Sequence, residues 1–182
     1  MVADSGFEGS SQATAALLPS NITVETINRS EVGSDDVMRG QIVDGIDNGP
    51  LLVNYFGHGS VRVWTGAGLL DSDLAATLTN NNKPSLFVMM TCLNGYSHDA
   101  YVDSLAESLL KAQQGGAMAV WASSGFTEAD PQFAMSKQFY QQLFSAPSMR
   151  LGDAARAAKI SAADPDVRRT WILLGDPSMR LR

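Results

Sequence analysis

The chain has 182 residues, 45% hydrophobic and 18% charged, which is the composition of a globular protein with enough apolar side chains for one sizeable core. Its formal net charge is −6 and its basic residues cluster only at Arg168–Arg169 and in the Arg180/Arg182 tail, which excludes the concentrated positive face that nucleic-acid binding needs. No apolar segment is long enough to cross a membrane, and a single cysteine excludes an internal disulfide and a multi-cysteine metal site.

Short apolar runs and segments with helical spacing alternate along the chain. β-Branched and aliphatic runs predict strands, and apolar residues that recur every three or four positions predict helices. In chain order, the predicted elements are strand 1–3, helix 11–19, strand 21–27, helix 34–49, strand 50–60, helix 71–78, strand 85–91, helix 102–116, strand 117–124, helices 130–144 and 150–163, and strand 170–177. This alternation predicts an α/β fold with a mostly parallel sheet, because parallel neighbours need a covering connection between them.

Two of the helices are predicted from their ends and faces. Ser34 is a candidate N-cap for the first, which Gly49 can end. The residues expected on the buried faces of the two helices are Val37, Ile42 and Ile46, and then Val102, Leu105, Leu109 and Ala112. Between the helices, residues 80–84 ("NNNKP") predict a surface turn.

Ligands of parallel α/β sheets bind at the carboxyl ends of the strands, so a functional site is expected there. Three of them carry glycine or reactive residues: "FGHGS" (56–60), "TCLNG" (91–95) and "WASSGF" (121–126). The single cysteine, Cys92, lies where an apolar run stops. If consecutive strands are neighbours in the sheet, His58 and Cys92 leave it at the same edge.

A Cys/His pair at one edge indicates nucleophilic catalysis. A thiol with a pKa of about 8.5 is only a few per cent thiolate at neutral pH, and a neighbouring imidazole raises that fraction or removes the proton. Gly57 and Gly59 let the backbone pass close to a substrate carbonyl. The amides of Gly59 and Cys92 are therefore the predicted donors to an oxyanion.

Other interpretations of these residues remain open. A free cysteine is often a small buried hydrophobe, and a histidine after a strand is often only a turn residue. His98 is a rival partner for Cys92, six residues further on. A metal site built from His58, Cys92, His98 and Asp99 fits no metal-binding spacing, so no metal site is predicted. The segment "GHGS" lacks the Gly-Lys-Ser/Thr ending of a phosphate loop.

Three segments together resemble the gingipain-type cysteine peptidases, which share the caspase-like fold: "LLVNYFGHGSVRVW", "VMMTCLNGYSHD" and "TWILLGDPSMRLR". The family pattern has His-Gly at the end of one strand, Cys-x-Asn-Gly at the end of the next and Gly-Asp-Pro near the domain end. All three occur here in order, with 34 positions from His58 to Cys92. The resemblance covers most of the chain and implies a caspase-like three-layer α/β/α sandwich with a mostly parallel central sheet.

The resemblance also implies a cysteine endopeptidase. Cys92 would attack the scissile carbonyl, His58 would protonate the leaving amine, and the Gly59 and Cys92 amides would hold the oxyanion. In gingipains an acidic side chain just after the first strand selects Arg or Lys before the cut. The matching position here is Asp4, whose carboxylate is suited to a guanidinium. An equally good alternative is that Asp4 caps a loop or the first helix.

The remaining site residues follow from the segment after the fifth strand. Ser123 and Ser124 are expected to offer backbone and hydroxyl contacts to substrate, and Phe126 an apolar side of the pocket. Asn94 is assigned no role beyond shaping the Asn-Gly turn. No cofactor is required. The resemblance leaves room for calcium as a structural ion, with residues 4–8 and 71–73 as the first places to look.

The domain organisation is expected to be one peptidase domain over 1–182, truncated within its first strand and excised from a larger, secreted or cell-surface bacterial protein. The first residues have neither the basic start nor the apolar stretch of a signal peptide. The expected partners are protein or peptide substrates with basic residues. Two alternative functions remain: a thiol acyl-transferase or transpeptidase on the same dyad, and a non-catalytic caspase-like interaction or secretion module.

Overall fold

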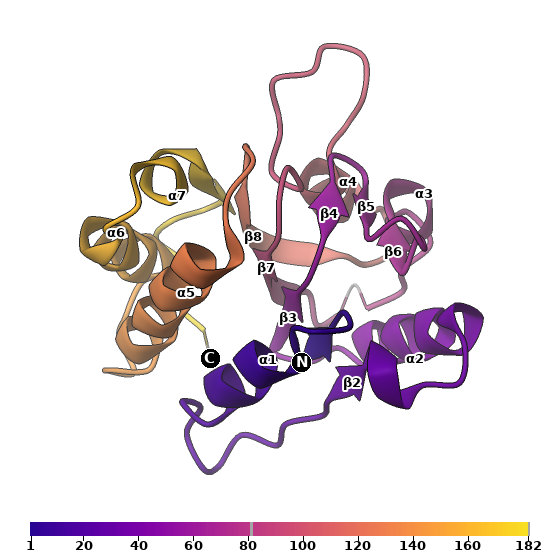
Figure 1. Cartoon of the computed structure of the whole chain (residues 1–182), viewed down its shortest axis with the longest axis horizontal. Helices are drawn as coiled ribbons and strands as arrows, with labels where there is room; N and C mark the ends of the chain where they lie inside the picture. Colours follow the sequence, from indigo (N-terminus) through magenta and orange to yellow (C-terminus); the bar gives the residue numbers. More distant parts are fainter. Residues whose placement is uncertain (81, 182) are drawn as a thin grey trace.

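The computed structural model describes residues 1–80 and 82–181 of the chain. A six-stranded sheet of order β2-β1-β3-β7-β8-β9 forms its centre, with helices on both faces (Figure 1). Its strands are β1 Val2–Ala3, β2 Ile27–Asn28, β3 Leu52–Phe56, β7 Ser85–Met90, β8 Ala117–Ser123 and β9 Trp171–Gly175. The helices are α1 Glu8–Ala15, α2 Asp35–Asp47, α3 Ser72–Ala75, α4 Leu105–Lys111, α5 Ala129–Leu143, α6 Leu151–Ser161 and α7 Pro165–Thr170. This architecture is the predicted α/β/α sandwich.

The strand pairing is parallel everywhere in this sheet except between β8 and β9. Every residue of β7 is buried, as its uninterrupted apolar sequence requires of a strand covered on both faces. One core cluster joins the sheet to α2, α3 and α4, and a second joins it to α5, α6 and α7. The expectation of a mostly parallel central sheet is confirmed.

Helix α2 begins as predicted, but its buried face differs. The Ser34 hydroxyl accepts a hydrogen bond from the Val37 amide at 3.3 Å, which caps the first turn. Val37 itself is 53% exposed, whereas Met38 is fully buried. The inward face is therefore Met38, Ile42 and Ile46, spaced four residues apart, and the assignment of Val37 to it was wrong.

Helix α4 is shorter than the predicted helix over 102–116. Ser104 and Glu107 form a capping box in which each side chain bonds the other residue's backbone amide, and this fixes the start at Leu105. Val102 lies before the helix and is 38% exposed. Ala112 follows the helix as its C-cap. The capping box outweighs the apolar spacing that suggested an earlier start.

Several other boundaries differ from the prediction. Helix α1 begins earlier, at Glu8, and the predicted strand over 21–27 is reduced to β2. Helix α7 was not predicted, because six residues are too few to show helical periodicity, although Asp164 caps it and Pro165 starts it. The predicted turn at 80–84 includes residue 81, which lies outside the described residues.

The predicted strand over 50–60 ends early and changes direction. Strand β3 stops at Phe56, and the chain then enters a small antiparallel sheet of β4 (Gly59–Ser60), β5 (Val63–Trp64) and β6 (Leu70–Asp71). This sheet was not predicted, because a two-residue strand is too short to show an alternation of apolar and polar residues. Its first hairpin starts directly after His58, so it forms one wall of the strand edge described next.

Candidate active site

His58 and Cys92 follow neighbouring parallel strands at the same edge of the sheet. Phe56 of β3 lies opposite Met90 of β7, so each site residue comes two positions after a paired strand end. The Gly57 amide donates a hydrogen bond to the Met90 carbonyl at 3.3 Å, so the segments that follow β3 and β7 stay side by side beyond that pair. His58 is exposed and Cys92 is partly exposed. The strand order that brings the two residues to one edge is thus the predicted one.

Cys92 lies on a tight turn that is docked against the end of β8. Leu93 has φ of +61°, a left-handed conformation that is uncommon for a residue with a side chain. The Leu93 amide donates to Gly125 O at 3.2 Å, and the Cys92 Sγ lies 3.5 Å from Thr127 O. The turn therefore presents the thiol at the strand edge and holds it from the β8 side.

The backbone of His58 is fixed by two hydrogen bonds to its carbonyl oxygen. One comes from the Tyr55 hydroxyl at 2.8 Å and the other from the Thr65 amide at 2.9 Å. Burial, and next the Asp4 carboxylate, raise the pKa of Tyr55 well above its usual value, so the hydroxyl stays a donor at neutral pH. The His58 ring packs edge-on against Phe7, with centroids 5.2 Å apart. The role of Tyr55 was not predicted from the sequence, although a tyrosine hydroxyl in a buried strand usually has a hydrogen-bond partner.

Gly59 packs against the backbone of Cys92. A Cβ at Gly59 would lie 3.2 Å from Cys92 O and would overlap Thr91 Oγ1, so the close approach requires glycine. Because Thr65 bonds His58 in the adjacent pair, Gly59 and its β5 partner Trp64 form a non-hydrogen-bonded pair. The Gly59 amide therefore points away from β5. The two residues predicted to bind an oxyanion are neighbours in space.

Asp4 follows β1 at this edge and is already paired. It is 3% exposed, and its Oδ1 accepts hydrogen bonds from Arg29 Nη1 and from the Ser5 amide, both at 2.9 Å. Arg29 also binds Asp35 in bidentate fashion, with Nε–Oδ1 at 2.8 Å and Nη2–Oδ2 at 3.0 Å. These bonds lower the pKa of Asp35 and raise the pKa of Arg29. Two carboxylates and one guanidinium leave this group with a net charge of −1.

The Asp4 side chain also borders the His58 segment. A Cβ at Gly57 would lie 2.6 Å from the Asp4 Cβ and would overlap the Tyr55 hydroxyl. Gly57 is therefore the position at which β1, β3 and the histidine segment come into contact. Predicted as a substrate-binding residue, Asp4 is here bonded within the chain, and its role toward substrate stays a prediction.

The end of β8 and the residue after it bond to Thr170, the last residue of α7. Ser123 Oγ donates to Gly125 O and lies 3.0 Å from Thr170 Oγ1. Ser124 Oγ donates to Thr170 O at 2.9 Å. Both predicted substrate-binding serines thus have partners within the protein, whereas Phe126 is 77% exposed. The predicted contacts of these residues with substrate remain predictions.

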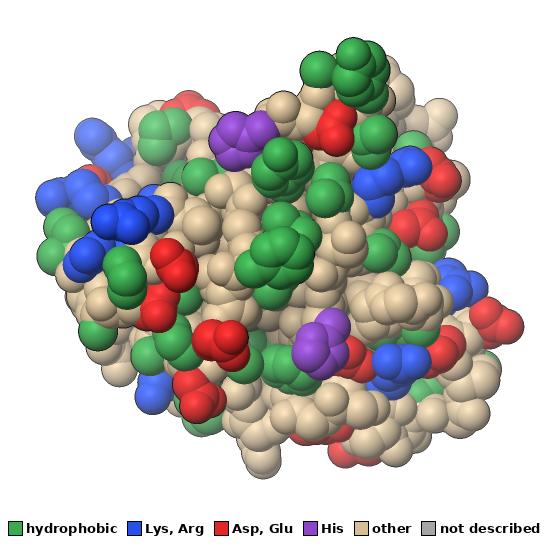
Figure 2. Space-filling view, turned by 45° about the horizontal axis from the view of Figure 1, so that its top comes forward, with side chains coloured by type: hydrophobic (Ala, Val, Ile, Leu, Met, Phe, Trp, Pro, Cys, Tyr) green, Lys and Arg blue, Asp and Glu red, His purple; other side chains and the backbone are tan. Residues whose placement is uncertain are grey.

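His98 lies on the segment between β7 and α4, which projects from the molecule at the top of Figure 1. The centroid of its ring is 5.1 Å from that of the Tyr96 ring. Figure 2 shows the two histidine side chains apart on the displayed face, with hydrophobic side chains between them. Within the described ranges, no group of three His, Cys, Asp or Glu side chains is arranged to hold a metal ion.

The acidic segments named as calcium candidates use their carboxylates within the chain. Their partners are Arg29 for Asp4, the Gly6 amide for Glu8, the Leu74 amide for Asp71 and Arg62 for Asp73. A hydrogen bond with Ser30, and to a smaller extent those from the Glu8 and Gly6 amides, lowers the pKa of Glu8.

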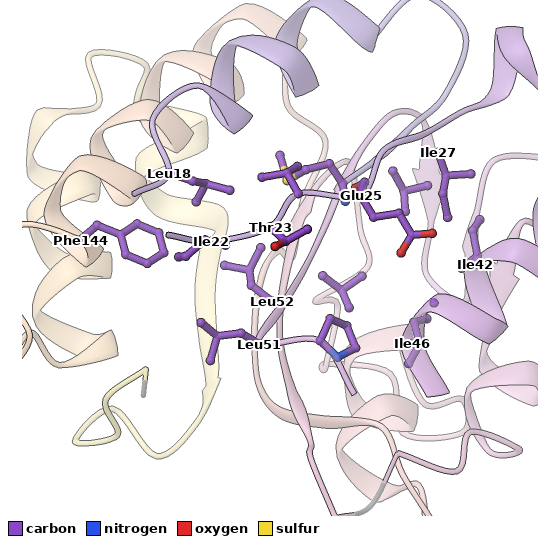
Figure 3. Close-up of a pocket in the computed structure, with 16 residues that line it drawn as sticks. Leu18, Ile22, Thr23, Glu25, Ile27, Ile42, Ile46, Leu51, Leu52 and Phe144 are labelled. Atoms are coloured by element: carbon purple, nitrogen blue, oxygen red, sulfur yellow. Dashed lines mark hydrogen bonds between the residues drawn. The ribbon is translucent and has the colours of Figure 1, made fainter. Parts of the chain in front are cut away.

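An apolar cavity lies away from His58 and Cys92, at the amino ends of β1 and β3 (Figure 3). It has a volume of about 260 Å³, and Leu18, Ile22, Leu51, Leu52 and Phe144 are among the side chains around it. Its lining is mostly aliphatic, with Thr23 and Glu25 among its few polar residues. In the described part of the chain, no helix has the length and apolarity needed to cross a membrane.

Solved structures share this fold. The crystal structure of the Arg-specific cysteine proteinase gingipain R (RgpB) has a TM-score of 0.84 at 22% identity, and the match covers all of this chain and 47% of that one. A complex of Porphyromonas gingivalis RgpB pro- and mature domains has a TM-score of 0.82 at 21% identity, covering 100% and 48% of the two chains. These likenesses confirm the predicted gingipain-like, caspase-like fold.

Sequence relatives point the same way. Gingipain R2 and Gingipain R1 of Porphyromonas gingivalis are each 25% identical to this chain over 155 residues, or 78% of it, and the match covers 21% and 15% of their own lengths. The chain thus spans about a fifth or less of these curated relatives. The model of peptidase family C25 matches all of residues 1–182. This full-length match and the strand-end positions of His58 and Cys92 lead to one conclusion: the chain belongs to peptidase family C25.

Proposed function

We propose that the chain is the catalytic domain of a cysteine endopeptidase that uses the His58/Cys92 dyad. The observation that carries the proposal is the pairing of β3 with β7, which places both residues at one sheet edge, with Gly59 packed on Cys92. A nucleophile, a base and two backbone amides at one place are the parts that acyl transfer from a peptide needs.

The chemistry follows from these groups. His58 takes the thiol proton as the Cys92 sulfur bonds to the scissile carbonyl carbon, and the carbonyl electron pair moves to oxygen, beside the Gly59 and Cys92 amides. When the pair returns, the C–N bond breaks and His58 gives its proton to the leaving amine. Water, deprotonated by His58, then attacks the thioester carbon, the C–S bond breaks, His58 returns the proton to the Cys92 sulfur, and the acid product leaves.

We propose that the residue before the cut is Arg or Lys. Support comes from the net negative group of Asp4, Arg29 and Asp35 beside the His58 segment, and from the relative described as Arg-specific. Because Arg29 holds Asp35 with two other nitrogen atoms, it can release Asp4 to a substrate cation and stay bound. Asp4 would then bind the guanidinium of a substrate arginine in place of that of Arg29.

Hydrolysis of a fluorogenic peptide panel tests both proposals. The panel carries Arg, Lys, Asn, Asp or Leu before the cleaved bond and is given to the wild type and to Cys92→Ala, with and without calcium. Cleavage confined to Arg or Lys and lost in Cys92→Ala would support both. Cleavage after Asn or Asp would keep the dyad and contradict the role of Asp4. A folded wild type that cleaves nothing would contradict the peptidase.

We further propose that the chain is one domain of a longer, exported bacterial protein whose substrates are proteins or peptides. The support is the length of the gingipain relatives, several times that of the matched region. Thermal melts of the wild type test calcium as a structural ion: the melting temperature must rise with calcium and fall with a chelator if an ion binds.

A further inference from the structure

Asn94 lies two residues after Cys92, and its side chain crosses to the hairpin that follows His58. It is fully buried, and its Nδ2 donates to Ser60 O at 2.5 Å and to Val63 O at 3.2 Å. Ser60 and Val63 are paired residues of β4 and β5. A single amide group therefore ties the nucleophile turn to the hairpin that contains Gly59.

The backbone of Asn94 is fixed as well. Its amide donates to Cys92 O at 2.8 Å, and its carbonyl accepts from the Ala106 amide at 3.0 Å. The neighbouring Leu105 amide donates to Val61 O at 2.8 Å, so the start of α4 holds both the turn and the hairpin. Asn94 is the residue at which these three segments meet.

The chemistry of the junction requires an amide donor. Two carbonyl oxygens face Nδ2, and a carboxylate in its place would set oxygen against oxygen. Asn94 Oδ1 is buried without a hydrogen-bond partner among the described residues. A buried acceptor left unpaired is costly, which indicates that the side chain is retained for its two donor bonds.

The position of this junction matters for catalysis. Gly59 lies one residue before Ser60 and packs on the carbonyl of Cys92, so the hairpin sets where the Gly59 amide stands relative to the Cys92 amide. Donors to an oxyanion act only within about 2.7–3.1 Å of it. A shift of about 1 Å in the hairpin would therefore reduce the rate by about 100-fold.

We propose that Asn94 is a positioning residue that fixes the Gly59 amide relative to Cys92, and this rests on the proposed peptidase function. It contacts no substrate. It acts by joining the turn that carries the nucleophile to the hairpin that carries the second oxyanion donor.

The experiment compares Asn94→Ala and Asn94→Asp with Asn80→Ala as a matched control. Asn80 is also buried, and its Nδ2 donates to Lys83 O and Gly116 O while its Oδ1 accepts from the Gly116 amide. Asn80 lies before β7 and its partner Gly116 lies just before β8, so this crosslink is at the opposite end of the sheet from Cys92. The control therefore removes a similar buried amide crosslink without touching the site.

Three experiments are made on each folded variant, well below its melting temperature. They measure kcat and KM for the best peptide of the panel, the rate of Cys92 alkylation by iodoacetamide, and hydrogen exchange of residues 59–64. Asn94→Ala is expected to lower kcat about 10- to 100-fold with KM within about threefold, because an oxyanion donor acts in the transition state. Alkylation needs no oxyanion donor and is expected to stay within about threefold of wild type. Exchange of 59–64 is expected to rise in both Asn94 variants but not in Asn80→Ala.

Several outcomes would overturn the proposal. The hairpin is not tied by Asn94 if its exchange in Asn94→Ala matches that of Asn80→Ala. A loosened hairpin with unchanged kcat would remove the positioning role. Equal losses of alkylation and hydrolysis would place the effect on the thiol rather than on Gly59. A wild type that hydrolyses no peptide contradicts the proposed function instead, and the exchange data still decide whether the crosslink exists.

Discussion

Arg29 donates a hydrogen bond from Nη1 to Oδ1 of Asp4 at 2.9 Å, so the buried carboxylate that follows β1 already holds a guanidinium. The arginine spans from Asp4 to Asp35 and ties β1 to the start of α2. This relationship makes the stability of the site edge and the proposed preference for basic residues depend on the same side chains.

Replacement of Arg29 separates these two roles. Arg29→Ala is expected to lower the free energy of unfolding by about 2–3 kcal/mol, because it leaves the Asp4 carboxylate buried without its cation. Asp4→Asn/Arg29→Ala is expected to recover part of this loss. Denaturant unfolding of the single and double variants measures the free energy of unfolding. If Arg29→Ala and the double variant lose the same amount, the loss does not come from leaving Asp4 without its cation.

The same variants report on specificity. If Asp4 binds the substrate cation, kcat/KM for Arg peptides is expected to be at least maintained in Arg29→Ala and to fall by about tenfold or more in Asp4→Asn, since charge-assisted bonds to a guanidinium are strong. Steady-state kinetics with Arg and Leu peptides checks this. An Arg/Leu ratio that Asp4→Asn leaves unchanged would move the specificity residue elsewhere.

Gly59→Ala tests the contact with Cys92. The added methyl group would overlap Thr91 Oγ1 and crowd Cys92 O, so the hairpin must move. We expect kcat to fall by about 100-fold, the size of effect seen when an oxyanion donor is lost. Gly66→Ala, where a Cβ meets open space, is the control and is expected to keep wild-type kcat.

Tyr55→Phe removes one of the two bonds to the His58 carbonyl and keeps the ring that stacks on Trp64. A lost hydrogen bond of this kind costs about 1 kcal/mol of stability. Because the Thr65 amide still bonds the same oxygen, kcat is expected to fall only about two- to tenfold. Thermal melts and kinetics together check this, and a larger loss of kcat without loss of stability would assign the hydroxyl a direct role.

The pH dependence of stability includes a contribution from Asp35. Hydrogen bonds from Arg29 lower the pKa of Asp35 in the folded state. A lowered carboxylate pKa stabilises the fold above its unfolded value of about 3.9, and this contribution is lost as pH falls through the folded pKa. Asp35→Asn is therefore expected to lower the melting temperature at pH 6 and to converge with wild type toward pH 2–3.

Melting curves of both proteins between pH 2.5 and 7 measure the effect. Asp36→Asn is the matched control, because it removes one formal charge in the same helical turn and its partner Arg39 is at the surface. A constant difference between Asp35→Asn and wild type across the whole pH range would contradict the assignment.

The sequence by itself predicted the mostly parallel sheet and the edge at which His58 and Cys92 lie. The apolar run 86–90 is typical of a strand covered on both faces, and alternation with helices favours parallel order. Parallel neighbours then bring the carboxyl ends of the predicted strands 50–60 and 85–91, and with them His58 and Cys92, to one edge of the sheet. These conclusions depend on local pattern and on rules of strand connection, which the sequence carries.

Only the tertiary structure decided how the side chains at that edge are used. Asp4 was predicted to bind a substrate guanidinium or to cap a loop or the first helix, but Arg29, distant in sequence, reaches it in space. Asn94 suggested only a turn, yet its amide crosses to the β4–β5 hairpin. Hydrogen bonds between residues 25 to 35 positions apart leave no periodic pattern in a single sequence. They depend on packing of the finished fold, which brings their donors and acceptors within bonding distance.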